Sequence, residues 1–148
     1  MKSSICNCKG QSLFEVLVAI GVSTLIVVAI VSLVTNSIRN TTLSKNKTLA
    51  ARYAQDATEW LRGQRDADID DFKSKATGTY CFNTLSWGNH DTCQADMTGT
   101  VLRREGSFDI SQPGGKTIIE ADVKVYWDDA QGTHEVRSVT NFADWRER

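Results

Sequence analysis

The stretch VLVAIGVSTLIVVAIVSLV, residues 16–34, contains nineteen residues without a charge and follows a single glutamate, Glu15. About twenty apolar residues are enough for a helix to cross a bilayer. The stretch is apolar on all sides, which indicates burial in lipid or among other helices. It is longer than the apolar core of a secretory signal, and no small-residue cleavage site follows it. The sequence therefore predicts a membrane helix that the mature protein keeps.

Glu15 stands at the edge of this apolar stretch. A carboxylate there costs a few kcal/mol unless it finds a partner or stays hydrated among lipid headgroups. Two interpretations follow from the residues. Either Glu15 is a solvated headgroup-level residue, or a partner neutralises it in an assembly.

A second helical pattern follows the apolar stretch. Apolar residues recur at intervals of three and four positions, namely Leu49, Ala50, Tyr53, Ala54, Ala57, Trp60 and Leu61. Gly63 and the acidic run Asp66–Asp71 predict that the helix ends near Arg65. An unbroken helix from Leu13 to Arg65 would be about 80 Å long, far more than a bilayer spans. We therefore expect the amphipathic half to lie outside lipid and to pack on another element.

The C-terminal half carries strand and turn signals. The expected strands are Thr79–Leu85, Gly99–Arg103, Lys116–Trp127 and Thr133–Asn141. The strongest alternates Ala121, Val123, Val125 and Trp127 with polar neighbours. Asp128–Gly132 is the expected hairpin loop, and Pro113–Gly115 is an expected turn. The sequence thus predicts an α+β fold, in which a long N-terminal helix packs its amphipathic second half on a small antiparallel sheet.

The segment KGQSLFEVLVAI, residues 9–20, resembles the N-terminal processing motif of type IV pilins and pseudopilins. In that family a basic leader ends in glycine, and a glutamate stands fifth in the mature chain before an apolar helix. The resemblance implies that a prepilin peptidase cleaves after Gly10 and methylates the new amine of Gln11. It also implies that Glu15 pairs with the N-terminus of a neighbouring subunit during filament assembly.

Several residues depart from the family pattern. Gln11 replaces the usual phenylalanine and could cyclise, which would remove the amine that assembly uses. Ser32 lies where many major pilins have a proline, which favours a minor pilin or a pseudopilin. The implied organisation is a leader at 1–10, a membrane and assembly helix at 11–38, its amphipathic continuation at 39–66, and a β-rich body at 67–148.

The resemblance also implies partners and a location. The partners would be other pilin or pseudopilin subunits, the peptidase and methyltransferase, a membrane-embedded assembly platform and lipid. The protein would be a single-pass protein of the bacterial cytoplasmic membrane with its body outside the cytoplasm, and would then enter the filament. The charge bias points the other way, because Lys2 and Lys9 precede the apolar stretch, whereas Arg39, Lys45, Lys47 and Arg52 follow it.

The four cysteines form two groups. Cys6 and Cys8 lie in the implied leader, and Cys81 and Cys93 lie in the body. In an oxidising exterior we expect a disulfide between Cys81 and Cys93, which would contribute about 3 kcal/mol. Trp87 lies inside the resulting loop and is the best candidate for an exposed contact residue.

Composition gives little support to other classes of function. Net charge is −1, with 17 basic and 18 acidic residues, so charge offers no case for nucleic-acid binding. The isolated His90 and His134 form no catalytic pattern, and we predict no enzymatic activity, cofactor or metal. Asp66–Asp71 departs from the EF-hand pattern, although calcium in another geometry stays open there.

Two hypotheses therefore compete. The first is a structural subunit, a minor pilin or pseudopilin, of a type IV pilus-like filament. The second is a single-pass membrane anchor that carries a small binding module and does not assemble. The sequence alone does not separate a secretion pseudopilus from an adhesive, motile or DNA-uptake pilus.

Overall fold

The computed structural model describes the backbone of residues 9–144 and the side chains of residues 13–144. The chain divides into two compact units, residues 1–44 and 45–148. Most of the implied leader lies outside the described residues. For Gly10 and Gln11 only the helical backbone is described.

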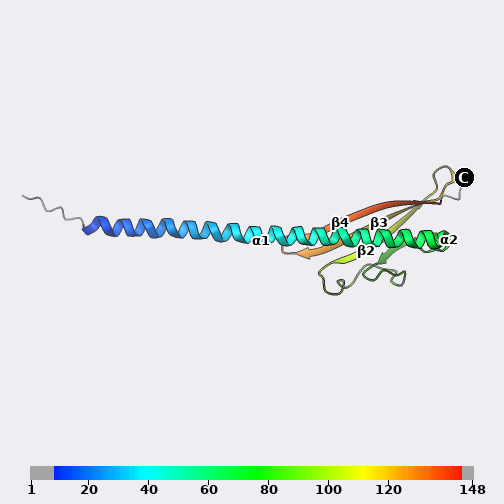
Figure 1. Cartoon of the computed structure of the whole chain (residues 1–148), viewed down its shortest axis with the longest axis horizontal. Helices are drawn as coiled ribbons and strands as arrows, with labels where there is room; N and C mark the ends of the chain where they lie inside the picture. The colour runs from blue at the N-terminus through cyan, green and yellow to red at the C-terminus, as the bar shows by residue number, and fades with distance from the viewer. Residues whose placement is uncertain (1–8, 145–148) are drawn as a thin grey trace, which may run out of the picture. The chain divides into compact units, whose positions relative to one another are not determined.

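A single long helix, α1, runs from Lys9 to Ala67 (Figure 1). Within the first unit, every side chain from Leu13 to Thr42 is exposed. The mean hydropathy reaches 2.8, so this part of α1 is long and apolar enough to cross a membrane. The long N-terminal apolar helix that the sequence predicts is confirmed.

In the second unit, the C-terminal part of α1 packs on the sheet through its predicted stripe. Ala50, Ala54, Ala57 and Leu61 are fully or almost fully buried. The small alanine side chains allow a close approach, so that Thr58 Oγ1 lies 3.0 Å from Ser138 Oγ of the last strand. The compact body therefore includes residues 45–66, which the sequence grouped with the helix.

The sheet contains β1 (Gly78–Cys81), β2 (Arg103–Ser111), β3 (Ile118–Asp129) and β4 (Gly132–Ala143). All neighbours are antiparallel, in the order β1-β2-β3-β4. On β3, Ala121, Val123, Val125 and Trp127 are buried and alternate with half-buried polar side chains, as the sequence predicts. The α+β arrangement of a helix on a small antiparallel sheet is thus confirmed.

The hairpin and the turn before it are also present, with shifted ends. β3 has the predicted length but lies two positions later, and β4 is longer than predicted. Asp129 pairs with Gly132 across a two-residue connection. Gly132 has a φ of 122°, a backbone conformation that residues with a side chain rarely adopt. Pro113–Gly115 forms the short helical turn η1.

The predicted strand Gly99–Arg103 is wrong over most of its length. Residues 98–101 form a turn and a bend, and β2 begins only at Arg103. Gly99 has a φ of 77°, and Thr100 Oγ1 donates to the carbonyl of Met97 and accepts from the Leu102 N–H. These local hydrogen bonds compete with strand pairing.

The acidic run also has a structure that the sequence did not predict. A second helix, α2, runs from Ile69 to Lys75. Asp68 caps it, because its carboxylate accepts hydrogen bonds from the backbone N–H groups of Asp70 and Asp71. The expected strand Thr79–Leu85 is shorter, since β1 ends at Cys81 where the disulfide loop begins.

Candidate functional site

Glu15 lies on the second turn of α1, directly before the apolar stretch, and its side chain is exposed. Among residues 13–144 it has no hydrogen bond and no ion pair. The next acidic residue along α1 is Asp56. Glu15 is therefore a carboxylate at the edge of an apolar surface whose partner, if it has one, lies outside the described chain.

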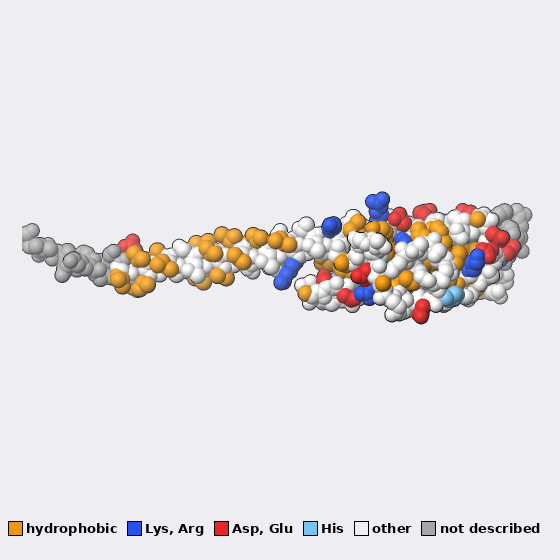
Figure 2. All heavy atoms as spheres, turned by 90° about the horizontal axis from the view of Figure 1, so that it is seen from below, with side chains coloured by type: hydrophobic (Ala, Val, Ile, Leu, Met, Phe, Trp, Pro, Cys, Tyr) orange, Lys and Arg blue, Asp and Glu red, His pale blue; other side chains and the backbone are white. Residues whose placement is uncertain are grey.

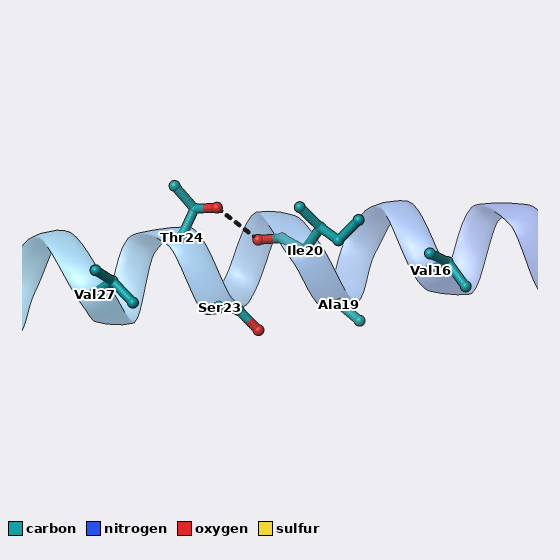
Figure 3. Close-up of a pocket in the computed structure, with 6 residues that line it drawn as sticks. All are labelled: Val16, Ala19, Ile20, Ser23, Thr24 and Val27. Atoms are coloured by element: carbon teal, nitrogen blue, oxygen red, sulfur yellow. Dashed lines mark hydrogen bonds between the residues drawn. The ribbon is translucent and has the colours of Figure 1, made fainter.

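One face of the apolar helix is shallowly hollowed. Its lining is Val16, Ala19, Ile20, Ser23, Thr24 and Val27 (Figure 3). The small Ala19 and Ser23 create the hollow. Thr24 donates its hydroxyl to the carbonyl of Ile20 at 2.8 Å, and Thr35 does the same to Val31. These hydroxyls need no water, which suits a helix in an apolar environment.

Apolar side chains follow one another along the N-terminal part of the helix (Figure 2). They include large residues with more than half of their surface exposed, such as Leu17, Leu25, Val28 and Leu33. A soluble protein rarely leaves so continuous an apolar surface uncovered. Among the residues that the structure describes, one helix near the N-terminus is thus long and apolar enough to span a membrane.

The predicted disulfide is confirmed, because Cys81 and Cys93 are bonded at 2.05 Å. The loop between them is tied to the sheet at several points. The Cys93 N–H donates to Glu105 at 2.9 Å, and Asn83 accepts from the Arg104 N–H at 3.1 Å. The disulfide therefore closes a loop that the body also holds by hydrogen bonds.

Trp87 is more enclosed than the sequence suggested. Its ring is half-buried and lies 5.2 Å from Trp60 and 5.1 Å from Tyr80, measured between ring centroids. Its indole N–H donates to Gln64 of α1 at 3.1 Å. Trp87 thus joins the disulfide loop to the helix. A contact role for its remaining exposed edge stays a prediction.

The sequence analysis missed two buried charges on β2. Arg104 is 4% exposed and donates to the carbonyls of Phe82 and Tyr53. Burial lowers its pKa, while Asp56 and Tyr53 act in the opposite direction. In the sequence, Arg103-Arg104-Glu105 looks like an ordinary surface charge run, and no local signal marks Arg104 as buried.

Glu105 is the second buried charge and points to the opposite face of the sheet. It accepts from Tyr126 Oη at 2.6 Å, and Lys124 Nζ lies 3.1 Å away. Burial alone would raise the pKa of Glu105, but these groups and the Cys93 N–H outweigh burial and lower it. Glu105 thus joins the sheet to the disulfide loop.

The remaining sequence candidates have local partners. Asp66 pairs with Arg65, and Asp71 pairs with Lys75. Over residues 13–144 no three acidic, histidine or cysteine side chains are grouped as metal ligands. The ring of His90 lies against that of Tyr80 at a tilt of 45°, with ring centroids 4.0 Å apart, and His134 Nε2 lies 2.9 Å from Asp129.

Comparisons of the chain with protein-family models, with curated proteins and with solved structures find no match, so the functional argument rests on the residues and their geometry.

Proposed function

We propose that this chain is a minor pilin or pseudopilin, a structural subunit of a type IV pilus-like filament. The observation that carries the proposal is Glu15, an exposed carboxylate without a described partner at the start of a charge-free apolar helix. A plain membrane anchor has no need of this carboxylate. A subunit that must align with a neighbouring subunit in a filament does need such a group.

The pairing follows from the cost of a lone carboxylate in an apolar setting. In a filament core, the helix surface around Glu15 packs against other helices and loses its water. Breaking a buried ion pair by removing one partner costs about 3–5 kcal/mol. The cationic N-terminus of a neighbouring subunit, at Gln11 after cleavage behind Gly10, would supply the counter-charge. That charge meets Glu15 only when the two subunits are offset by one particular distance along the filament axis, so the ion pair would fix this offset.

Adhesion between subunits would come from the apolar helix itself. Lipid tails are as apolar as its side chains, so helices associate in membranes through close packing rather than through the hydrophobic effect. The hollow at Ala19 and Ser23 lets a neighbouring backbone approach (Figure 3). Exposure of every side chain from Leu13 to Thr42 leaves this surface free for such packing.

The proposed life cycle has two stages. The chain is first stored as a single-pass protein of the cytoplasmic membrane, with its leader inside and its body outside the cytoplasm. A prepilin peptidase then removes the leader and methylates Gln11, and an assembly platform transfers the helix from lipid into the filament. The Cys81–Cys93 disulfide suits a body in an oxidising compartment.

Intact-mass measurement of the protein from native membranes tests the processing step. We expect a chain that lacks residues 1–10 and carries one methyl group. A retained leader would contradict the proposal and favour the membrane-anchored binding module instead.

Substitution of Glu15 tests the assembly step. Glu15→Ala should leave membrane insertion intact and abolish incorporation into filaments, whereas Glu15→Asp should retain part of it. Glu59→Ala is the matched control, because Glu59 is an exposed glutamate on the same helix whose ion pair with Arg62 lies within the body. Normal filaments from Glu15→Ala would refute the pairing role.

A further inference from the structure

The face of the sheet that points away from α1 carries a polar hollow. Thr79 of β1, Ser107 of β2 and Asp122 of β3 lie directly opposite one another across the three strands. They line a hollow of about 210 Å³ together with Glu105, Lys124 and Arg137. Because these residues lie on paired strands, the backbone fixes the positions of their polar groups. The hollow is therefore a candidate binding site.

One carboxylate oxygen in this hollow lacks a hydrogen-bond donor. Asp122 Oδ2 accepts from Arg137 Nη1 at 3.0 Å, whereas Asp122 Oδ1 is buried and has no hydrogen-bond partner. The side-chain hydroxyls of Thr79 and Ser107 also form no hydrogen bond with residues 13–144. Buried polar atoms in folded proteins are nearly always hydrogen-bonded, so Asp122 Oδ1 indicates a missing donor. The row thus presents three acceptors for a donor that the described chain does not supply.

The two cations that line the hollow are already engaged. Lys124 Nζ lies 3.1 Å from the carboxylate of Glu105. Arg137 donates to Glu135 at 2.9 Å and to Asp122 Oδ2 at 3.0 Å. Neither cation donates to Asp122 Oδ1. The hollow therefore has room for a further cation.

Two acids beside the hollow also lack a counter-charge. Asp109 of β2 and Glu120 of β3 lie opposite each other in the next row of side chains on the same face. Both are exposed, and neither has an ion pair or a hydrogen bond with residues 13–144. Directly opposite like charges destabilise a sheet. The closest preceding cation in the chain, Lys116, lies four positions before Glu120 and outside β3.

The balance of charge on this part of the face is negative. Three neighbouring rows carry four acids and two cations, namely Glu105, Asp109, Glu120 and Asp122 against Lys124 and Arg137. A positively charged ligand is therefore favoured over a neutral or an anionic one.

We propose that the row formed by Thr79, Ser107 and Asp122, here called the ammonium pocket, binds one end of a small aliphatic diamine. A primary ammonium group has three N–H donors and no acceptor, which matches the three acceptors that lack a donor. Side chains directly opposite each other in a sheet have Cβ atoms about 5 Å apart. A nitrogen above Ser107 can therefore reach the oxygen atoms on both sides.

The second ammonium group of the diamine would lie at Asp109 and Glu120. The next row on the same face is about 7 Å away along the strands, a distance that a four-carbon chain spans. A metal ion fits less well, because within residues 13–144 no three acidic, histidine or cysteine side chains are grouped as ligands. The inference needs only the folded body and would survive failure of the filament proposal.

The test uses the full chain in micelles of an uncharged detergent and follows the backbone amide NMR signals of Thr79, Ser107 and Asp122 during titration. The first probe is putrescine, a diamine with a four-carbon chain. The second is n-butylamine, which carries one ammonium group, as a lysine side chain does. The third is the fully N-methylated analogue of putrescine, which keeps both charges but has no N–H donor.

For putrescine we expect half-saturation at about 1 mM or below. Butylamine should bind about threefold more weakly, because it cannot contact the second row. The methylated analogue should bind at least about tenfold more weakly, because it cannot donate to the three acceptors.

Four variants locate the site. Asp122→Asn should weaken putrescine binding at least about tenfold. Ser107→Val should also weaken it by filling the pocket, and it keeps the ion pair between Asp122 and Arg137. Glu120→Gln should weaken the binding of putrescine about threefold and leave that of butylamine unchanged. Glu135→Gln is the matched control, because Glu135 pairs with Arg137 on the same face but does not line the pocket, and it should leave binding within about twofold.

Absence of a saturable shift at the three amides up to about 20 mM putrescine would overturn the proposal. Equal binding of the methylated analogue would do the same, since charge alone would then explain the shifts. Equal binding of butylamine and putrescine would refute the diamine, and unchanged binding in Ser107→Val would refute the pocket.

Discussion

Gly106 occupies a position in β2 where no side chain fits. A Cβ at this residue would lie 2.3 Å from Phe82 Cε2 and 2.7 Å from Phe82 Cδ2. Phe82 has little freedom to move away. It is fully buried, stacks on Tyr80 with ring centroids 5.7 Å apart, and meets the edge of Trp60 at 5.4 Å. Gly106→Ala therefore forces a shift in the aromatic core between helix and sheet.

The expected magnitude follows from two opposing effects. Overpacking a core costs about 1–3 kcal/mol. Replacing a strand glycine by alanine gains back about 0.5–1 kcal/mol in backbone entropy. We expect a net loss of about 1–2 kcal/mol in the free energy of unfolding. For a body of this size, each kcal/mol lowers Tm by about 4–8 °C.

Thermal unfolding of the full chain in detergent micelles, followed by the near-ultraviolet circular dichroism of the aromatic cluster, measures this loss. Gly63→Ala is the control, because Gly63 lies in α1 and a Cβ at that residue would have no other atom within 4 Å. This control change should stabilise by about 0.5–1 kcal/mol. Phe82→Leu should relieve the clash, so that Gly106→Ala and Phe82→Leu couple by at least about 1 kcal/mol. A loss below about 0.5 kcal/mol for Gly106→Ala, or strict additivity of the two changes, would refute the reasoning.

Three further perturbations probe the body in the same unfolding assay. Replacing Cys81 and Cys93 together by serine should lower the free energy of unfolding by about 3 kcal/mol, and an unchanged Tm would contradict the role of the disulfide. The pKa of Glu105 lies below its ordinary value of 4.5, so its contribution to stability is complete above about pH 4.5 and is lost as pH falls through the depressed folded-state pKa. Glu105→Gln should therefore flatten the acid decline of stability, and an identical pH profile would argue against this account. Arg104→Lys keeps the charge but cannot donate to both the Phe82 and the Tyr53 carbonyl. It should lower the free energy of unfolding by about 1–3 kcal/mol. A loss within experimental error would show that one donor is enough.

Local patterns in the sequence were sufficient for the long elements. The apolar stretch 16–34 and the stripe from Leu49 to Leu61 predicted α1, because helical periodicity and hydropathy act over a few turns of one segment. The alternation around Val123 and Val125 predicted the buried face of β3 for the same reason. The cysteine spacing predicted the disulfide once an oxidising exterior was assumed.

Short elements were harder to predict, because side-chain hydrogen bonds decided them. The acidic run looked like the end of a helix, yet the Asp68 carboxylate starts α2. The segment before Arg103 looked like a strand, yet Thr100 and Gly99 fold it into a turn. In the candidate site, Glu15 was evident from its place in an apolar stretch, whereas the partners of Arg104 were not, because Tyr53 is 51 positions away in the chain.

The sequence by itself determined that this protein has an apolar helix with one carboxylate at its start, followed by an amphipathic helix and a β-hairpin. Only the tertiary structure decided that Arg104 and Glu105 are buried on opposite faces of one strand and that Trp87 turns inward. The physical reason is the distance along the chain over which each effect acts. Periodicity and hydropathy act between residues a few positions apart, whereas burial and charge pairing depend on which distant segments the folded chain brings together.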